Sequence, residues 1–116
     1  MEIILIKEPV TREELTRIAQ AGFGNFVKAV VDISQGVMAI GGELHADEET
    51  VLTEQCQSKR EHTWGINLYQ EKKEDEWIEF DSMINLKPQH GNRSRSVENP
   101  EIREAIVAIV NKLIEN

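Results

Sequence analysis

The segment GGELHADEE, residues 41–49, places two glycines, a histidine and four acidic residues within nine positions. If a strand predicted over residues 37–44 continues through His45, then Glu43, His45 and Asp47 share one face, because strand side chains alternate. Carboxylates and an imidazole are suitable ligands for a divalent metal ion. Crowded carboxylates also raise one another's pKa, which suits acid–base chemistry. The alternative is a corner from strand to helix, with His45 in a turn and Asp47 as the N-cap residue.

The same alternation, applied to all predicted strands, gathers further polar side chains on the face that carries His45. Under a metal-site hypothesis, a divalent ion would be held by Glu43, His45, Asp47, Glu79 and Asp81. Under a hypothesis of ligand binding without metal or cofactor, the contacts come from Lys28, Asp32, Asn67 and Asn85. A third interpretation is a solvated sheet face, on which Lys28 and Asp32 form ordinary cross-strand ion pairs.

Two other segments contain groups that could do chemistry. Arg93 and Arg95 stand in the loop QHGNRSRS, and arginine forks can hold a phosphate or a carboxylate. The segment is not a P-loop, so a solvated loop is the simpler interpretation. Cys56 and His62 are close in sequence, but nucleophilic Cys–His pairs are normally distant in sequence, which favours an incidental thiol.

The polar face could instead be covered by a second subunit. Its apolar contacts in a homodimer would come from Val30, Val37, Tyr69, Trp77 and Met83. The alternative for these residues is scattered surface hydrophobicity.

The elements that position these residues follow from the hydrophobic pattern. Strands are predicted over residues 3–6, 26–33, 37–44, 63–69 and 77–86. The second and third are joined by a short Gly-containing turn, and the last two by the charged loop QEKKEDE. Helices are predicted after the N-cap residues Thr11 and Asn99, and a short helix or an irregular segment from residue 46.

The resulting order, β-α-β-β-(α)-β-β-α, predicts one α+β domain over residues 1–116. It has a mainly antiparallel sheet of about five strands, with two main helices packed on one face. The first strand is expected to run parallel to the second through a crossover connection.

Composition limits the classes of function. The formal net charge of −8 argues against binding nucleic acid or an anionic membrane, and suits a basic partner or a metal ion. One cysteine, no signal-peptide pattern and no long apolar run predict a cytoplasmic protein.

Four longer segments carry a resemblance to a known family: VVDISQGVMAIGGELHADEE, WGINLY, WIEFDSMINLKP and GNRSRSVENPEIR. From about Ile3 to Ile114, the chain resembles a family of small prokaryotic proteins known only as a domain of unknown function. The resemblance implies a stand-alone intracellular module and supplies no activity, cofactor or catalytic residue. The stretch TEQCQSK departs from that family's pattern, so Cys56 need not serve a shared function.

Two functions therefore remain open. The first is a non-enzymatic module that binds a small ligand or protein partner through the polar sheet face and the arginine loop. The second is a metal-dependent hydrolase-type enzyme in which one carboxylate acts as general base.

Overall fold

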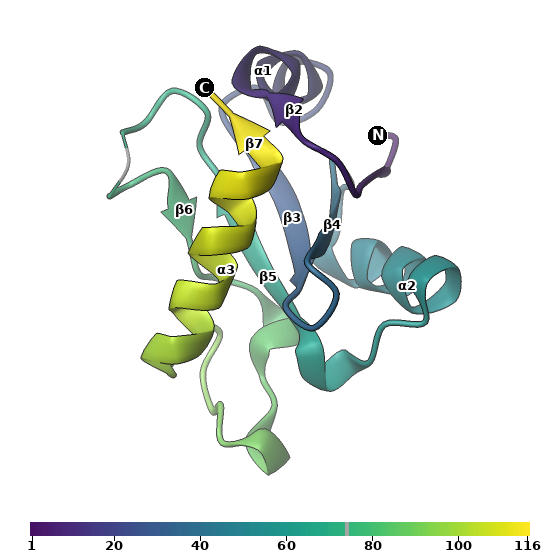
Figure 1. Ribbon diagram of the computed structural model, residues 1–116, viewed down its shortest axis with the longest axis vertical. Helices are drawn as coiled ribbons and strands as arrows, with labels where there is room; N and C mark the ends of the chain where they lie inside the picture. The colour runs from purple at the N-terminus through teal and green to yellow at the C-terminus, as the bar shows by residue number, and fades with distance from the viewer. Residues whose placement is uncertain (74) are drawn as a thin grey trace.

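The computed structural model describes residues 1–73 and 75–116, so Glu74 of the predicted charged loop lies outside the described residues. Figure 1 shows the three α-helices and the strands that they surround. The helices are α1 (Arg12–Gln20), α2 (His45–Cys56) and α3 (Pro100–Leu113). The strands are β1 (Ile4–Ile6), β2 (Val10–Thr11), β3 (Val27–Asp32), β4 (Val37–Ile40), β5 (Thr63–Leu68), β6 (Ile78–Glu79) and β7 (Ile114–Glu115). Three short 3₁₀ helices are η1 (Arg60–His62), η2 (Met83–Asn85) and η3 (Pro88–His90).

The main sheet has five strands in the order β1-β4-β3-β5-β6, and every neighbouring pair is antiparallel. The α+β class and the antiparallel sheet are therefore confirmed. The two predicted hairpins are present as β3–β4 and β5–β6. β1 runs in the same direction as β3, but β4 lies between them, so the first strand is an edge strand and does not pair with the second predicted strand.

Both predicted N-caps of the long helices are confirmed. The Thr11 hydroxyl accepts a hydrogen bond of 3.1 Å from the Glu14 amide, and the Asn99 side chain accepts one of 2.8 Å from Glu101. Each cap satisfies a backbone N–H that has no partner within its helix.

A second, two-stranded sheet was not expected from the sequence. β2 pairs in parallel with β7, in the register Val10 with Ile114 and Thr11 with Glu115. The pairing sets the start of α1 beside the end of α3, as Figure 1 shows. The Arg12 side chain reinforces it, because the guanidinium donates to Gln70 O, Lys72 O and Asn116 Oδ1.

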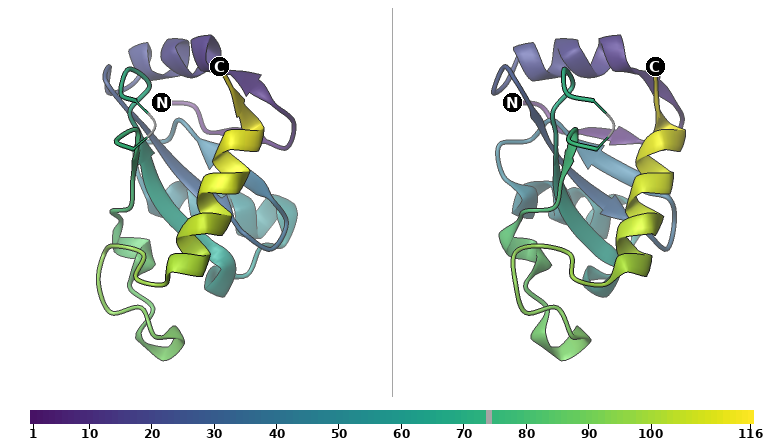
Figure 2. Two further views of the ribbon diagram at one scale, coloured as in Figure 1. Left: turned by 60° about the vertical axis from the view of Figure 1, so that its left-hand side comes forward. Right: turned by 90° about the vertical axis from the view of Figure 1, so that its left-hand side faces the viewer.

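The larger hydrophobic core lies on the face of the sheet that carries Val27, Ala29 and Val31 of β3. Leu15 and Ala19 of α1 belong to it, together with Ile106, Val110 and Leu113 of α3. In the left view of Figure 2, α3 crosses in front of the strands and α2 lies behind them. The alternation predicted for β3 is thus confirmed on this inner face.

The opposite, outer face is not simply solvated. Val30 and Ala39 on that face form a second core cluster with Leu52 of α2, and all three side chains are fully buried. The packing of the helices on one face is therefore not confirmed, because α2 covers part of the other. Val30 cannot contribute to a subunit interface, and neither can Trp77, which is buried in the larger core under the Arg12 guanidinium.

Two predicted strands are shorter than expected. β4 ends at Ile40, and Gly41 follows with φ +89°, a value that favours glycine. The last predicted strand, 77–86, contains only β6, because the Ser82 hydroxyl accepts from the Ile84 amide and starts η2. Of the two alternatives for the GGELHADEE segment, the structure therefore shows the corner from strand to helix, and no strand continues through His45.

Candidate binding surface

The corner at residues 41–44 determines where the acidic and histidine side chains of the GGELHADEE segment point. Glu43 and Asp47 are exposed, whereas His45, Glu48 and Glu49 are buried. The N-cap residue of α2 is Leu44, so the prediction that Asp47 is the N-cap was also wrong. Helical spacing replaces the two-residue spacing of a strand, so Glu43, His45 and Asp47 do not share a face.

His45, at the start of α2, points toward β5. Its Nε2 lies 2.8 Å from the Ile66 carbonyl oxygen. A carbonyl oxygen can only accept, so Nε2 carries the hydrogen and Nδ1 of the neutral ring has a free lone pair. Burial lowers the pKa of His45, the hydrogen bond to Ile66 opposes that shift, and the charges of Lys28, Asp81 and Arg95 also act on the ring.

Three of the predicted ligand-binding residues, and two of the predicted metal ligands besides His45 itself, lie around this histidine or are linked to it. Lys28 of β3 is directly opposite Asn67 of β5 in the sheet register, and Asn67 is opposite Glu79 of β6. The Asn67 Nδ2 donates to Glu79 Oε1 over 2.8 Å, and the Tyr69 hydroxyl donates to the same oxygen over 3.2 Å. We call the following residues the polar cluster: Lys28, His45, Asn67, Tyr69, Glu79, Asp81 and Arg95.

Asp81 and Arg95 form the other side of the polar cluster. Arg95 Nε donates to Asp81 Oδ1 over 2.7 Å, and both side chains are about half exposed. An ion pair this accessible to solvent contributes little to stability, so both groups are available to a partner. Two residues after Asp81 stands Met83, and between them the Ser82 side chain packs against Gly65, next to the His45 ring.

Apolar side chains that are exposed to solvent adjoin the polar cluster. Phe23 stacks on Phe26 with ring centroids 4.8 Å apart, and Phe26 stacks on Tyr69 at 5.4 Å. Phe23, Leu44 and Met83 are 41 %, 53 % and 63 % exposed. We call the polar cluster, together with Phe23, Phe26, Leu44 and Met83, the outer surface.

The remaining predicted ligand-binding residues have other positions. Asp32 is 1 % exposed and holds the β3–β4 turn, because its carboxylate accepts from the Ser34 and Gln35 amides and from the Ser58 hydroxyl. Asn85 is fully buried and bonds both the N–H and the C=O of Gly65. Arg93 is exposed on its loop, where its amide donates to Glu98.

Among the residues that the structure describes, no three His, Cys, Asp or Glu side chains are grouped so that they could hold a metal ion. The His45 Nε2, one of the two nitrogens that could bind a metal, is already bonded to Ile66. The structure thus adds no support to the metal-dependent alternative, which stays a prediction.

Sequence reasoning did not single out several buried polar residues. Glu48 is fully buried: Oε2 accepts from the Gly42 amide over 2.8 Å, Oε1 has no partner among the described residues, and burial raises the carboxyl pKa to about 9. Asn92 is 4 % exposed and holds the arginine loop by bonds to Asn85 O, Ser94 O and Ser96 O. Because polar residues are usually exposed, nothing in the sequence alone indicates that Glu48 and Asn92 are buried.

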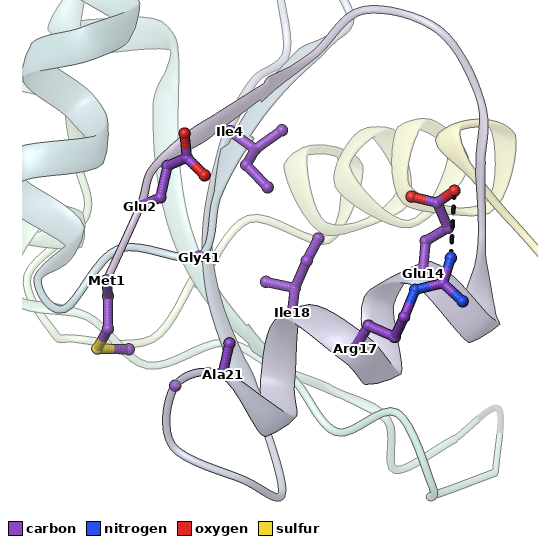
Figure 3. Close-up of a pocket in the computed structure, with 9 residues that line it drawn as sticks. Met1, Glu2, Ile4, Glu14, Arg17, Ile18, Ala21 and Gly41 are labelled. Atoms are coloured by element: carbon purple, nitrogen blue, oxygen red, sulfur yellow. Dashed lines mark ion pairs between the residues drawn. The ribbon is translucent and has the colours of Figure 1, made fainter.

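A separate hollow of about 250 Å³ lies between β1 and α1, at the other end of the corner. Figure 3 shows Ile4 and Ile18 pointing into it and the Glu14–Arg17 ion pair on its rim. Its wall is mostly apolar and contains none of the predicted site residues.

The fold and the outer surface define a small α+β protein with a mixed polar and aromatic patch beside the first turn of a helix. The chain belongs to the family described as "Protein of unknown function (DUF5674)", whose model matches residues 4–113. No curated protein and no solved structure matches the chain. The family resemblance is therefore confirmed, and it assigns no activity. None of the described helices has the length and apolar character needed to cross a membrane.

Proposed function

We propose that this protein is a non-enzymatic binding module and that it binds a protein partner through the outer surface. The observation that carries the proposal is the exposure of Phe23, Leu44 and Met83 around the polar cluster. Aromatic residues, Met and Arg are enriched at protein interfaces, where apolar contacts are combined with a polar rim. The Phe23 ring continues into the stacked rings of Phe26 and Tyr69, and exposed apolar surface beyond scattered single residues marks interaction sites on soluble proteins.

The polar cluster supports specificity for such a partner. Glu79 Oε1 is bonded by Asn67 and Tyr69, which fixes the carboxylate, and its second oxygen can accept from a partner. Lys28 and Arg95 lie near enough for their charges to act on the His45 ring, and both offer donors to a partner. Because the chain carries a net charge of −8, electrostatic attraction favours a partner with basic character.

A second copy of the chain is one candidate for this partner, as the homodimer hypothesis requires. Of the residues first considered for that interface, Met83 and the partly exposed Tyr69 belong to the outer surface, while Val30 and Trp77 are buried within the chain. Self-association would therefore have to combine Met83 with Phe23 and Leu44, which the homodimer hypothesis did not include.

The experiment that tests the proposal introduces a photo-crosslinking residue at Met83, with Leu86 as the matched control. Leu86 is also exposed, at 40 %, but does not belong to the outer surface. We expect crosslinks in cells from position 83 to one defined partner or to a second copy. The variant Phe23→Ser/Leu44→Ser should reduce them at least tenfold without lowering Tm by more than the Leu86→Ser control. Equal crosslinking from both positions, or none from position 83, would contradict the proposal.

A further inference from the structure

A second cavity lies outside the outer surface, between α2, η1 and the segment 84–90. Its volume is about 350 Å³, and its wall combines apolar side chains with the ionisable side chains of Glu49, Arg60, Glu61, Lys87 and His90. A cavity of this size accommodates a small organic molecule. The residue that distinguishes it is Lys87, because a lysine is rarely buried without a charged partner.

Lys87 is only 7 % exposed. Its Nζ donates to the Ile84 carbonyl oxygen over 2.8 Å and lies 4.9 Å from the centre of the Trp64 ring. Among the described residues, no carboxylate forms an ion pair with it. Burial lowers the pKa of Lys87; Glu49 opposes the shift, and Arg60 adds to it. The neutral amine, which is the nucleophilic form, is therefore more populated than in an exposed lysine.

Arg60 supplies a second recognition element in the same cavity. Its Nη1 binds Glu49 Oε1 over 3.2 Å, while the Glu49 Oε2 accepts from the Thr63 hydroxyl. Glu49 is thus held by Thr63 on one oxygen and by Arg60 on the other. The guanidinium has five N–H donors, and those not used by Glu49 can bind a carboxylate.

We propose that Lys87 is a carbonyl-binding lysine and that this cavity takes small 2-oxo acids, with the ligand carboxylate on Arg60. The Lys87 amine adds to the ligand carbonyl carbon, forming a C–N bond. The carbonyl oxygen then leaves as water after taking up the two amine hydrogens through proton exchange, and a Schiff base remains. No oxidant or reductant is involved, and addition of water reverses the reaction. Glu61 and His90 at the cavity wall can exchange the protons.

The test is reductive trapping of the full chain with glyoxylate and cyanoborohydride, read by peptide mass spectrometry. Labelling rates of all lysines are compared within the same sample, so the result does not depend on a variant that folds. We expect Lys87 to be labelled at least tenfold faster than the exposed Lys59 and Lys112 at pH 7. Labelling spread evenly over the exposed lysines, with Lys87 no faster, would overturn the proposal.

Two variants separate the amine from the carboxylate site. Lys87→Arg should abolish the fast adduct, and a circular dichroism spectrum and Tm check its fold. Arg60→Gln should slow trapping of glyoxylate at Lys87 several-fold more than trapping of uncharged acetaldehyde, which is affected only through the contribution of the Arg60 charge to the Lys87 pKa. Equal effects on both aldehydes would refute the role of Arg60 in binding the carboxylate. This site is independent of the outer surface, so the two proposals can fail separately.

Discussion

The carboxyl group of Glu48 in the first turn of α2 accepts a hydrogen bond of 2.8 Å from the backbone amide of Gly42. The bond closes the corner between β4 and α2 and therefore positions His45. The Glu48 carboxyl group that accepts this bond lies in a site that solvent does not reach. Gly42 is part of the same fit, because a Cβ at that position would lie 2.9 Å from the Ile3 side chain and 3.0 Å from Glu48 Cγ.

The burial of Glu48 predicts how stability depends on pH. The carboxyl is protonated in the folded state up to a pKa of about 9 but has a value of 4.5 when exposed, so the folded state binds more protons between these pH values. Stability due to Glu48 is therefore fully present below pH 4.5 and is lost as pH rises toward 9. Glu48→Gln is neutral at every pH. Its free energy of unfolding, relative to that of the parent protein, should therefore rise by up to about 1.4 kcal/mol per pH unit in this window.

Urea unfolding at pH 5, 7 and 8.5 measures this difference. Glu54→Gln, at an exposed position of the same helix, is the matched control. Its free energy of unfolding should follow that of the parent protein across the three pH values. If the Glu48→Gln and parent curves also run parallel, Glu48 is ionised in the folded state and the assignment is wrong.

For His45 we expect stability to depend on pH with the opposite sign. Its pKa is lowered from 6.5 by burial, so below pH 6.5 the unfolded chain takes up a proton that the folded protein does not. Stability is present above pH 6.5 and is lost as pH falls toward the folded value. His45→Gln retains a donor for the Ile66 carbonyl and should show a weaker loss, by up to about 1.4 kcal/mol per pH unit. An NMR titration of the His45 ring checks the direction; a pKa at or above 6.5 would disprove it.

The absence of a side chain at Gly65 leaves the space that Ser82 and His45 occupy in the outer surface. A Cβ there would lie 2.5 Å from Ser82 Cβ and 3.2 Å from His45 Cδ2. Gly65→Ala should therefore destabilise the fold by about 1–3 kcal/mol, the usual cost of overpacking, and should shift the His45 ring resonances. Gly22→Ala is the control: its Cβ would lie 2.7 Å from the Cε of the exposed Met1, a flexible side chain that can move, and at ordinary contact distances from Ile18 O and Ala19 O. Equal, small losses in both variants would mean that Ser82 does not pack as described.

We expect the planar shape of the Arg12 guanidinium, more than its charge, to stabilise the contact between the two ends of the chain. Its three bonds go to Gln70 O, Lys72 O and Asn116 Oδ1, and its planar group lies 4.1 Å from the Trp77 ring centre. Arg12→Lys keeps the charge but cannot span these acceptors, so it should cost about 1–2 kcal/mol. Arg17→Lys affects only the exposed pairs with Glu13 and Glu14 and should change the unfolding free energy very little. If both variants lose a similar amount of unfolding free energy, the hydrogen bonds of Arg12 do not stabilise the fold as we expect.

The inner half of the fold could be predicted from the sequence because its signals are local. Alternation in β3 predicted which side chains face the helices, and Thr11 and Asn99 predicted two helix starts from their own capping chemistry. β7 could not be predicted, because Ile114 continues the apolar stripe of α3 and two residues of strand leave no periodic signal.

The outer half could not be predicted because α2 does not have an amphipathic sequence. Its buried face includes His45, Glu48 and Glu49, so the helix that covers Val30 and Ala39 has the composition of a solvated segment. Alternation placed Lys28 and Asn67 on the face opposite the larger core, but the division of that face into a buried part and an open part was not foreseen. Lys87 was missed for the same reason, since nothing adjacent to it in sequence indicates burial.

The parallel pairing of β2 with β7 has a consequence for the order of folding. Arg12 and Asn116 are separated by 104 positions, so α1 leaves the ribosome long before the strand that fixes it. Until then, the apolar side of α1, with Leu15 and Ala19, lacks its contacts with the C-terminal segment. Contacts of such high sequence separation form late because the intervening chain must first be ordered. We therefore expect docking of β7 to be the final step of folding, after the five-stranded sheet has formed.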